Sequence, residues 1–382
     1  MKLLHTSDWH LGRMLYGRSL LPDQEYFIDQ VFLPAVRQER PDIVLLAGDL
    51  FDRQIAPVEA IRLFDRVLAC LQAEKIPIAA ITGNHDGPDR LTLAAPLLRQ
   101  HGIYLATRLE DAFSPVCLQD SCGQTVQIFL LPYCEPAAVR AFLKQDNLRG
   151  FDACYRALLA EIKKLFHPSA LHILVAHCFV AGSQISESET SAYVGGAGEV
   201  HTDCFDGFDY VALGHLHAPQ KAGPNGRYSG TPLKYSFDEE SHKKSMTVIE
   251  SSLSGLSTRL LPVVPRRDMR TISGTLDELI LAGKQQKMED FVQLRITDPN
   301  PVYLPAERLR PYYPNMLSLH CDWLHAQNLQ NQELRSQLFN RNVDDSAVLD
   351  LFLSQICGTT VGETDRELFL QACQEVKGEV ES

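Results

Sequence analysis

Short apolar runs that end in potential metal ligands are the feature of this sequence that most constrains its fold. Each run is too short for a helix and most are rich in β-branched residues, which is typical of buried strands. Segments with helical periodicity lie between them, at residues 25–37, 56–72 and 152–166. Strands that alternate with helices predict a layered α/β fold. The predicted strands are residues 3–6, 43–47, 78–81, 128–131, 173–176 and 210–213.

Side chains that bind metal ions follow five of these six strands. In an open α/β fold the carboxyl ends of the strands gather ligands, so these side chains should converge. Carboxylates can bridge two cations, imidazoles suit Mn, Fe or Zn, and an asparagine carbonyl completes a shell without adding charge. The pattern predicts two metal ions, which can clamp a phosphate and activate water. The residues are Asp8 and His10, Asp49, Asn84 with His85, His177, and His215 with His217.

Glycine precedes three of these ligands, Asp49, Asn84 and His215. Because glycine adopts backbone conformations that other residues avoid, we expect sharp turns that aim the three ligands into a cleft. Taken alone, an aspartate after a strand is usually a helix cap or turn former, and a buried histidine is usually packing. The ordered set of residues is therefore the signal, and no single member is.

The ordered set resembles the motifs of calcineurin-like metallophosphoesterases. Three further stretches, at residues 6–12, 230–232 and 236–239, are similar to the Mre11/SbcD family, in its bacterial form. The resemblance implies a β-sandwich flanked by helices, with a small α+β capping domain and a helical C-terminal tail. The motifs are Asp8-x-His10, Gly48-Asp49-x-x-Asp52, Gly83-Asn84-His85-Asp86, His177 and Gly214-His215-x-His217.

The resemblance also implies a role for each site residue. It places Asp8, His10, Asp49 and His217 on one divalent ion, expected to be Mn²⁺. The second ion takes Asn84, His177 and His215 and shares Asp49 as a bridge. His85 is implied to act in catalysis, by steadying the transition state or protonating the leaving oxygen. Asp52 stands where some relatives carry a histidine, which leaves open whether a second imidazole assists.

Two shifts in composition divide the chain into three parts. Proline and charge interrupt the pattern at residues 261–268, which ends a predicted metallophosphoesterase domain at 1–264. Residues 265–325 form a predicted DNA-binding capping domain, with helices near 276–282 and 306–312 and strands at 291–296 and 316–321. Residues 326–382 comprise a polar linker and two amphipathic helices, near 346–356 and 365–376. These helices either pack on the capping domain or, as we favour, dock onto a partner protein.

Charge and cysteine content limit where the protein acts. The net charge of −12 counts against a nucleic-acid protein, but bound cations and a local basic groove can offset it. Ten cysteines without a Cys-x-x-Cys pair indicate free thiols in a reducing compartment, and no apolar run reaches membrane-spanning length. We expect a cytoplasmic protein, nucleoid-associated when on DNA. Basic residues near the motifs are either surface charges or phosphate contacts: Arg13, Arg18, Arg53, Arg90, Lys234, Lys243 and Lys244.

The resemblance implies a Mn-dependent exonuclease and endonuclease of double-stranded DNA, acting on ends and hairpins in repair and recombination. The chain has no P-loop, so any ATP dependence must come from a partner, implied to be an SbcC/Rad50-like coiled-coil ATPase. A homodimer within a heterotetramer is also implied. Two rival functions remain, another dinuclear phosphoesterase acting on phosphoproteins, cyclic nucleotides or lipid precursors, and a catalytically silent DNA-end scaffold. The region after residue 264 counts against the first rival and the complete ligand set against the second.

Overall fold

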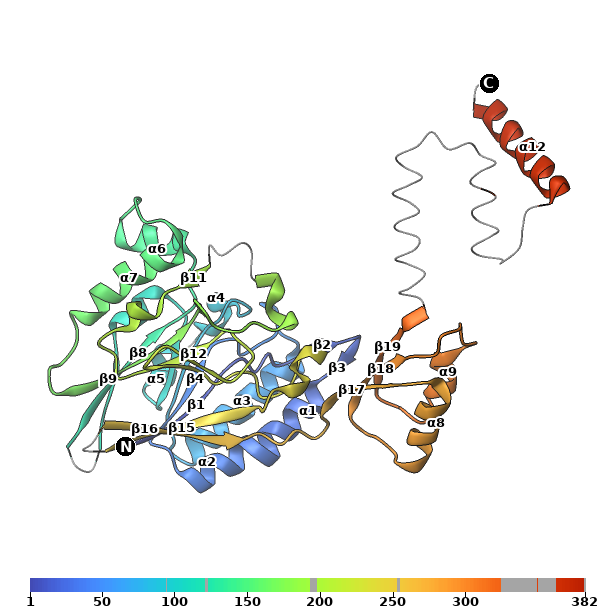
Figure 1. Ribbon diagram of the computed structural model, residues 1–382. Helices are drawn as coiled ribbons and strands as arrows, with labels where there is room; N and C mark the ends of the chain where they lie inside the picture. The colour runs from blue at the N-terminus through green and yellow to red at the C-terminus, as the bar shows by residue number, and fades with distance from the viewer. Residues whose placement is uncertain are drawn as a thin grey trace. The chain divides into compact units, whose positions relative to one another are not determined.

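The structure is a computed structural model, and it describes residues 1–93, 95–120, 123–192, 198–252, 255–323, 349 and 362–380 (Figure 1). Contacts between Cα atoms divide the chain into two compact units. The first consists of Met1–Ile272, Gly283–Leu294 and Arg310–Ser318, and the second of Ser273–Ala282, Arg295–Leu309 and Leu319–Ser382. The first unit contains all the predicted ligands.

One six-stranded sheet of the first unit begins with three of the predicted strands. Its order is β16-β15-β1-β4-β5-β6, and the run β1-β4-β5-β6 is parallel. β15 pairs antiparallel with β1, and β16 pairs antiparallel with β15. The strands are β1 (Lys2–Thr6), β4 (Ile43–Ala47), β5 (Ile78–Ile81), β6 (Ile103–Ala106), β15 (Ser245–Ser252) and β16 (Gly255–Pro262).

A second six-stranded sheet contains the other three predicted strands. Its order is β13-β14-β12-β9-β8-β7, with β14, β12, β9 and β8 parallel. The outer strands β13 and β7 are antiparallel to their neighbours. The strands are β7 (Val116–Gln119), β8 (Thr125–Leu131), β9 (Ala170–His177), β12 (Tyr210–Gly214), β13 (Gln220–Ala222) and β14 (Gly226–Tyr228).

The two sheets face each other across an apolar core. Leu45 of the first sheet and Ile128 and Val175 of the second belong to one cluster of buried side chains. Because side chains alternate along a strand, the opposite faces need cover from helices. The parallel strands and their two buried faces explain why these segments are near-continuous apolar runs in the sequence.

Helices cover the outer face of each sheet. A continuous helical run of α1 (Leu21–Tyr26), the π-helix η1 (Phe27–Phe32) and α2 (Leu33–Glu39), with α3 (Val58–Ala73), packs its apolar side chains on the first sheet. On the second sheet lie α6 (Pro136–Leu143) and α7 (Gly150–Lys163), in the same cluster as Leu174. The expected β-sandwich flanked by helices is therefore confirmed.

Short elements connect these layers. The short strands are β2 (Met14–Leu15), β3 (Arg18–Ser19), β10 (Phe179–Val180) and β11 (Glu199–Val200). Two α-helical turns, α4 (Pro88–Leu91) and α5 (Ala95–Arg99), follow β5. The 3₁₀ turns are η2 (Leu109–Phe113), η3 (Glu187–Ala192), η4 (Thr202–Phe205) and η5 (Phe237–Ser241).

The C-terminal region adds a three-stranded sheet in the order β17-β18-β19. Its elements are β17 (Met269–Gly274), α8 (Leu276–Gln285), β18 (Phe291–Ile296), α9 (Pro305–Leu309) and β19 (Met316–Cys321). The helix predicted at 306–312 ends at Leu309, because Pro311 disfavours helical backbone at the residue before it. The helix predicted at 365–376 lies within α12 (Glu363–Val380), and the one predicted at 346–356 lies outside the described residues apart from Leu349. Among the helices that the structure describes, none is long and apolar enough to cross a membrane.

Candidate metal centre

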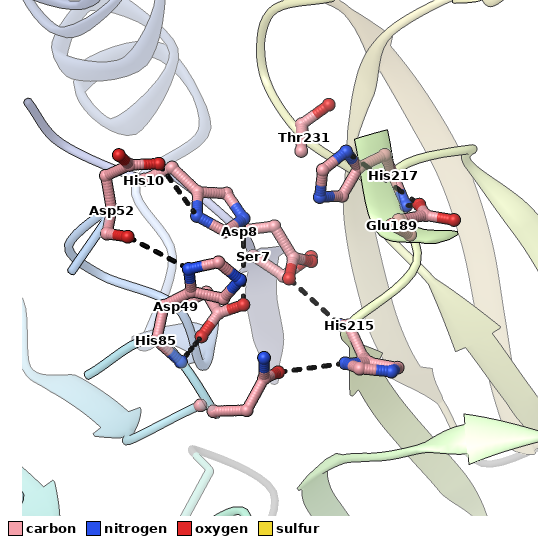
Figure 2. Close-up of polar contacts among 12 residues, drawn as sticks. Ser7, Asp8, His10, Asp49, Asp52, His85, Glu189, His215, His217 and Thr231 are labelled. Atoms are coloured by element: carbon pink, nitrogen blue, oxygen red, sulfur yellow. Dashed lines mark hydrogen bonds and ion pairs between the residues drawn. The ribbon is translucent and has the colours of Figure 1, made fainter. Parts of the chain in front are cut away.

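The strand ends of both sheets bring the predicted ligands together. Asp8 and His10 follow β1, Asp49 follows β4, and Asn84 and His85 follow β5, all in the first sheet. From the second sheet, His177 ends β9, while His215 and His217 follow β12. Figure 2 shows the labelled members of this group pointing toward one another. The seven predicted ligands and His85 therefore lie in one site.

Asp49 lies at the middle of this site. Its Oδ2 is 3.6 Å from Nε2 of His10 and 3.4 Å from Nε2 of His177. Its Oδ1 accepts a 2.9 Å hydrogen bond from the backbone N–H of His85. Asn84 Oδ1 lies 3.0 Å from both His177 Nε2 and His215 Nδ1. The carboxylate therefore has ligand atoms from both sheets beside it, as a bridge between two ions requires.

Several buried polar atoms of the site have no hydrogen-bond partner among the described residues. They are Oδ2 of Asp8 and both ring nitrogens of His10. Buried polar atoms are normally paired, and a ligand that these atoms held jointly would satisfy them. One ligand atom each from Asp8, His10 and Asp49 lie within 4.8 Å of one another. This donor set of carboxylate and imidazole fits a divalent cation.

The raised pKa of Asp8 also fits a bound cation. Burial raises the pKa of the Asp8 carboxyl to about 8; His177 opposes the rise and the Asp49 carboxylate adds to it. Burial and the neighbouring Asp49 carboxylate thus oppose ionisation of Asp8 at neutral pH unless positive charge lies beside it. A bound divalent cation supplies that charge.

Hydrogen bonds select the tautomers of two histidines. Nδ1 of His177 donates to the Ala47 carbonyl at 2.9 Å, and Nδ1 of His85 donates to the Asp52 carbonyl at 2.9 Å. Each bond leaves the Nε2 atom of that ring available to the site. A carbonyl behind a ligating imidazole fixes both its ring orientation and its tautomer. The Nε2 atom of His177 can therefore serve as a metal ligand.

Only one of the three glycines that precede ligands makes the sharp turn that was predicted. Gly48 has a positive φ of +89°, so the expected sharp turn is present there. Gly83 and Gly214 instead leave room: a Cβ at Gly83 would lie 2.2 Å from Asp49 Oδ1, and one at Gly214 would lie 1.8 Å from the Ala47 carbonyl oxygen. The left-handed conformation falls on ligands themselves, with φ of 52° at Asp8 and 49° at Asp49.

The predicted basic residues fall into three groups. Three already have partners: Arg13 bonds to Asp52 Oδ1 at 2.9 Å, Arg18 to Asn315 Oδ1 at 2.7 Å, and Lys234 pairs with Asp268 at 2.9 Å. Arg53, Arg90 and Lys243 are exposed. Lys244 is 6% exposed, so it is neither the surface charge nor the phosphate contact that the sequence left open. Its ammonium group is buried against protein acceptors that take all of its protons.

Asp86 has a structural role that sequence reasoning did not assign. Its carboxylate accepts the backbone N–H groups of Leu50, Phe51 and Gly83, at 2.9 to 3.1 Å. These bonds hold the loop after β4 against the loop after β5. Asp86 stands next to His85 in the motif, which is the only signal that the sequence offers for it.

Tyr133 was also missed. It follows β8, the one predicted strand with no ligand at its end, and β8 lies beside β9 in the second sheet. Its ring centre is 6.1 Å from that of His177 and 6.5 Å from that of His215. Its hydroxyl donates to Glu135 at 2.7 Å. Three neighbouring strands thus bring side chains to the site, but only two of them bring metal ligands.

Comparison with known proteins agrees with this geometry. Residues 1–219 match the family described as calcineurin-like phosphoesterase. The chain is 31% identical to SbcD, the D subunit of nuclease SbcCD, of Staphylococcus epidermidis over 92% of each chain. The chain belongs to the SbcD family of calcineurin-like phosphoesterases. A second relative of the same name, from Staphylococcus saprophyticus, is 30% identical over 94% of each chain. Residues 265–355 match the family described as type 5 capsule protein repressor C-terminal domain.

This SbcD-family phosphoesterase is an enzyme that hydrolyses phosphate esters. The membership covers the site, because all seven candidate ligands lie within residues 1–219. The family and the cluster of Asp8, His10 and Asp49 together support a metal centre.

Proposed function

We propose that this phosphoesterase is the nuclease component of a complex that cleaves double-stranded DNA, as an exonuclease at ends and an endonuclease at hairpins. The observation that carries the proposal is that the likeness to relatives named as the D subunit of nuclease SbcCD spans 92% and 94% of the chain. It extends past residue 264, through a region that an enzyme for small phosphate esters would not need. DNA repair and recombination are the processes that use such an activity.

The proposed cofactor is a pair of Mn²⁺ ions. Asp8, His10, Asp49 and His217 would hold one ion. Asp49, Asn84, His177 and His215 would hold the other. Two such ions, when bound, activate water and offset the charge that develops on the phosphate. Imidazole, carboxylate and amide donors together suit Mn²⁺.

His85 is the proposed catalytic proton donor. Its Nδ1 proton is committed to the Asp52 carbonyl, and its backbone N–H to Asp49 Oδ1. These two bonds hold the ring beside the metal ligands while leaving Nε2 without a bond to them. When Nε2 also carries a proton, the imidazolium can hand that proton to a leaving alkoxide and keep its Nδ1–H bond. His85 therefore acts on the leaving oxygen and Asp49 acts through the ions.

The proposed DNA contacts are with phosphates and carry no sequence preference. Arg53 and Arg90 follow the ligand motifs and are exposed, with no ion pair among the described residues. They are the strongest candidates. Arg13, Arg18 and Lys234 are assigned the same role, although each must share its charge with a protein partner.

The proposed assembly is a homodimer bound to an SbcC/Rad50-like coiled-coil ATPase, in the cytoplasm and on the nucleoid. Residues 1–264 would form the nuclease domain, 265–325 the DNA-binding capping domain, and 326–382 the linker and docking helices. In α12, Leu368 is 62% exposed, as a side chain that docks into a partner's groove must be before binding.

Hydrolysis of linear duplex DNA with Mn²⁺ tests this proposal. The wild-type chain, assayed with and without the ATPase, should cleave duplex DNA. Asp8→Ala should lose Mn²⁺ affinity and activity together, whereas His85→Ala should bind Mn²⁺ normally and lose turnover. Cleavage of bis(p-nitrophenyl) phosphate without any cleavage of duplex DNA would instead favour the small-substrate phosphoesterase. A metal-loaded chain that cleaves neither substrate would favour the silent scaffold.

A further inference from the structure

Two of the stretches that resemble the SbcD family, residues 230–232 and 236–239, contain none of the candidate ligands. The structure places both beside one ligand, His217. Glu239 lies in η5 and is fully buried, at 0% exposure. A fully buried carboxylate requires compensating partners, because removing it from water is unfavourable. The identity of those partners indicates what these stretches do.

Two partners of the Glu239 carboxylate are Ser188 and the ring of His217. Ser188 Oγ donates to Glu239 Oε1 at 2.7 Å and lies 2.6 Å from His217 Nδ1. His217 Nδ1 is itself 3.4 Å from Glu239 Oε1. Because the hydroxyl proton of Ser188 goes to the carboxylate, its lone pair accepts the Nδ1 proton of His217. This arrangement leaves Nε2 of His217 unprotonated and available to a metal ion.

Lys244 bonds to the second oxygen of the Glu239 carboxylate. Its ammonium group donates to Glu239 Oε2 at 2.5 Å, to Thr231 Oγ1 at 2.7 Å and to the His217 carbonyl at 2.8 Å. All three protons are therefore used inside the protein. The ammonium charge offsets the buried carboxylate, and the same group holds the backbone of His217.

The backbone of His217 is held from two further directions. Its N–H donates to the buried carboxylate of Glu189, and its carbonyl accepts the backbone N–H of Thr231 at 3.2 Å. Figure 2 shows Glu189 and Thr231 on either side of His217. Both the ring and the backbone of this residue are thus fixed by residues that follow or precede it at a distance in the sequence.

We infer that Glu239, charge-compensated by Lys244 and linked through Ser188, is the positioning residue that sets the tautomer and orientation of His217 for metal binding. His177 and His85 are oriented by backbone carbonyls, which no side-chain substitution removes. The ring of His217 depends on side chains instead. The stretches at 230–232 and 236–239 therefore serve the metal centre although they supply no ligand. This inference rests on the proposed role of His217 as a metal ligand.

Mn²⁺ binding, followed by isothermal titration calorimetry and electron paramagnetic resonance, tests the inference. Glu239→Gln keeps the size of the side chain and removes its charge. One of the two ions should bind about 10- to 100-fold more weakly, the usual effect of losing a partner behind a ligand. The spectrum at limiting Mn²⁺ should then change from a coupled pair to single ions. Ser188→Ala should weaken the same ion without leaving a buried charge unpaired.

A second variant and two controls keep the outcome clear. Glu239→Gln/Lys244→Met removes both charges, so it tests the inference if Glu239→Gln fails to fold. Ser241→Ala, at an exposed serine in the same turn, should bind both ions as the wild type does. If the wild-type protein does not bind two Mn²⁺ ions, or if His217→Ala binds two Mn²⁺ ions normally, the proposed metal centre is wrong. If those two behave as expected but Ser188→Ala and the double variant bind both ions normally, this inference alone is overturned.

Discussion

Asp8, His10 and Asp49 have left-handed backbone conformations, with φ of 52°, 45° and 49°. Such a conformation is unfavourable by roughly 1 to 2 kcal/mol for residues other than glycine. Unfavourable backbone gathers at functional sites, where the surrounding structure holds it in place. The stability of the β-sandwich therefore offsets this backbone cost and holds the three ligands in their orientation toward the site.

This strain predicts that Asp8→Gly will be more stable than Asp8→Ala in the metal-free protein, by about 1 kcal/mol. Both variants lose the same carboxylate, so only the backbone preference separates them. Urea denaturation measures the difference. The same pair at Asp89, an exposed residue of helix α4, should show the opposite order, because glycine disfavours helix. An Asp8→Ala variant as stable as Asp8→Gly would contradict the prediction.

His5 is a fully buried histidine outside the ligand set, and it makes stability depend on pH. Burial lowers its pKa from 6.5 to about 3, with a backbone hydrogen bond opposing the fall. Below pH 6.5 the unfolded chain takes up a proton that the folded chain refuses. The free energy of unfolding should therefore fall by about 1.4 kcal/mol per pH unit from this residue as pH drops from 6.5 toward 3.

Denaturation of His5→Gln at pH 7 and pH 5 checks this contribution. The variant should lose less stability than the wild type between the two pH values. His101→Gln, at an exposed histidine, controls for the replacement itself. An equal loss in His5→Gln and wild type would show that His5 does not contribute.

The candidate ligands were predictable because each lies at the end of its strand or directly after it in the sequence. Glu239 and Lys244 were not, since their roles arise from contacts with His217, 22 and 27 residues away. Lys244 was expected at the surface, as a solvated charge or a phosphate contact, because the sequence shows its charge but not its burial. Tyr133 was missed because a tyrosine after a strand has no distinctive chemistry until its neighbours are known.

Among the elements, the loops after β4 and β5 act as one unit because Asp86 accepts three backbone N–H groups from them. Asp86→Ala would leave three buried donors unpaired. An unpaired buried group destabilises a protein by roughly 1 to 3 kcal/mol, so a loss on the order of 3 kcal/mol is expected. Mn²⁺ affinity should fall as well, because these loops carry Asp49 and Asn84.

Thermal unfolding and Mn²⁺ titration of Asp86→Ala measure these two effects. Asp65→Ala, at an exposed position of α3, provides the matched control and should change neither quantity. Retention of wild-type stability by Asp86→Ala would mean that water or other groups satisfy the three donors, and the structural role would be withdrawn.

The predicted strands all exist because apolar runs with two buried faces are a strong local signal. The β15–β16 hairpin was not predicted, although β15 is the neighbour that completes pairing with β1. The second strand of that hairpin has mostly exposed side chains, so it lacks the apolar run that marked the others. The segment at 25–37 was expected as one α-helix, but it contains a π-helical stretch. The spacing of apolar residues does not distinguish a short π-helix from an α-helix.

For the whole molecule, several large apolar side chains remain exposed. Val58 and Ile61 of α3 are 56% and 48% exposed, and Leu97 of α5 is 63% exposed. A contiguous exposed apolar patch often marks an interface, whereas scattered apolar side chains are ordinary. If the proposed homodimer forms through α3 and α5, its interface would bury these three side chains.

Ile61→Glu and Leu97→Glu should therefore shift the protein from twice the mass of the chain to the mass of one chain. Light scattering coupled to size-exclusion chromatography measures this. Leu165→Glu, at another partly exposed leucine beyond the end of α7, should leave the mass unchanged. A dimer that persists in both test variants would place the interface elsewhere.

We propose that ligands from the two sheets hold two metal ions that share Asp49. The most direct measurement is anomalous diffraction from crystals of the protein grown with Mn²⁺. Two peaks that share the Asp49 carboxylate are predicted, one beside Asp8, His10 and His217 and the other beside Asn84, His177 and His215. A single peak, or a peak held by His10, Asp52 and His85 instead, would contradict the claim.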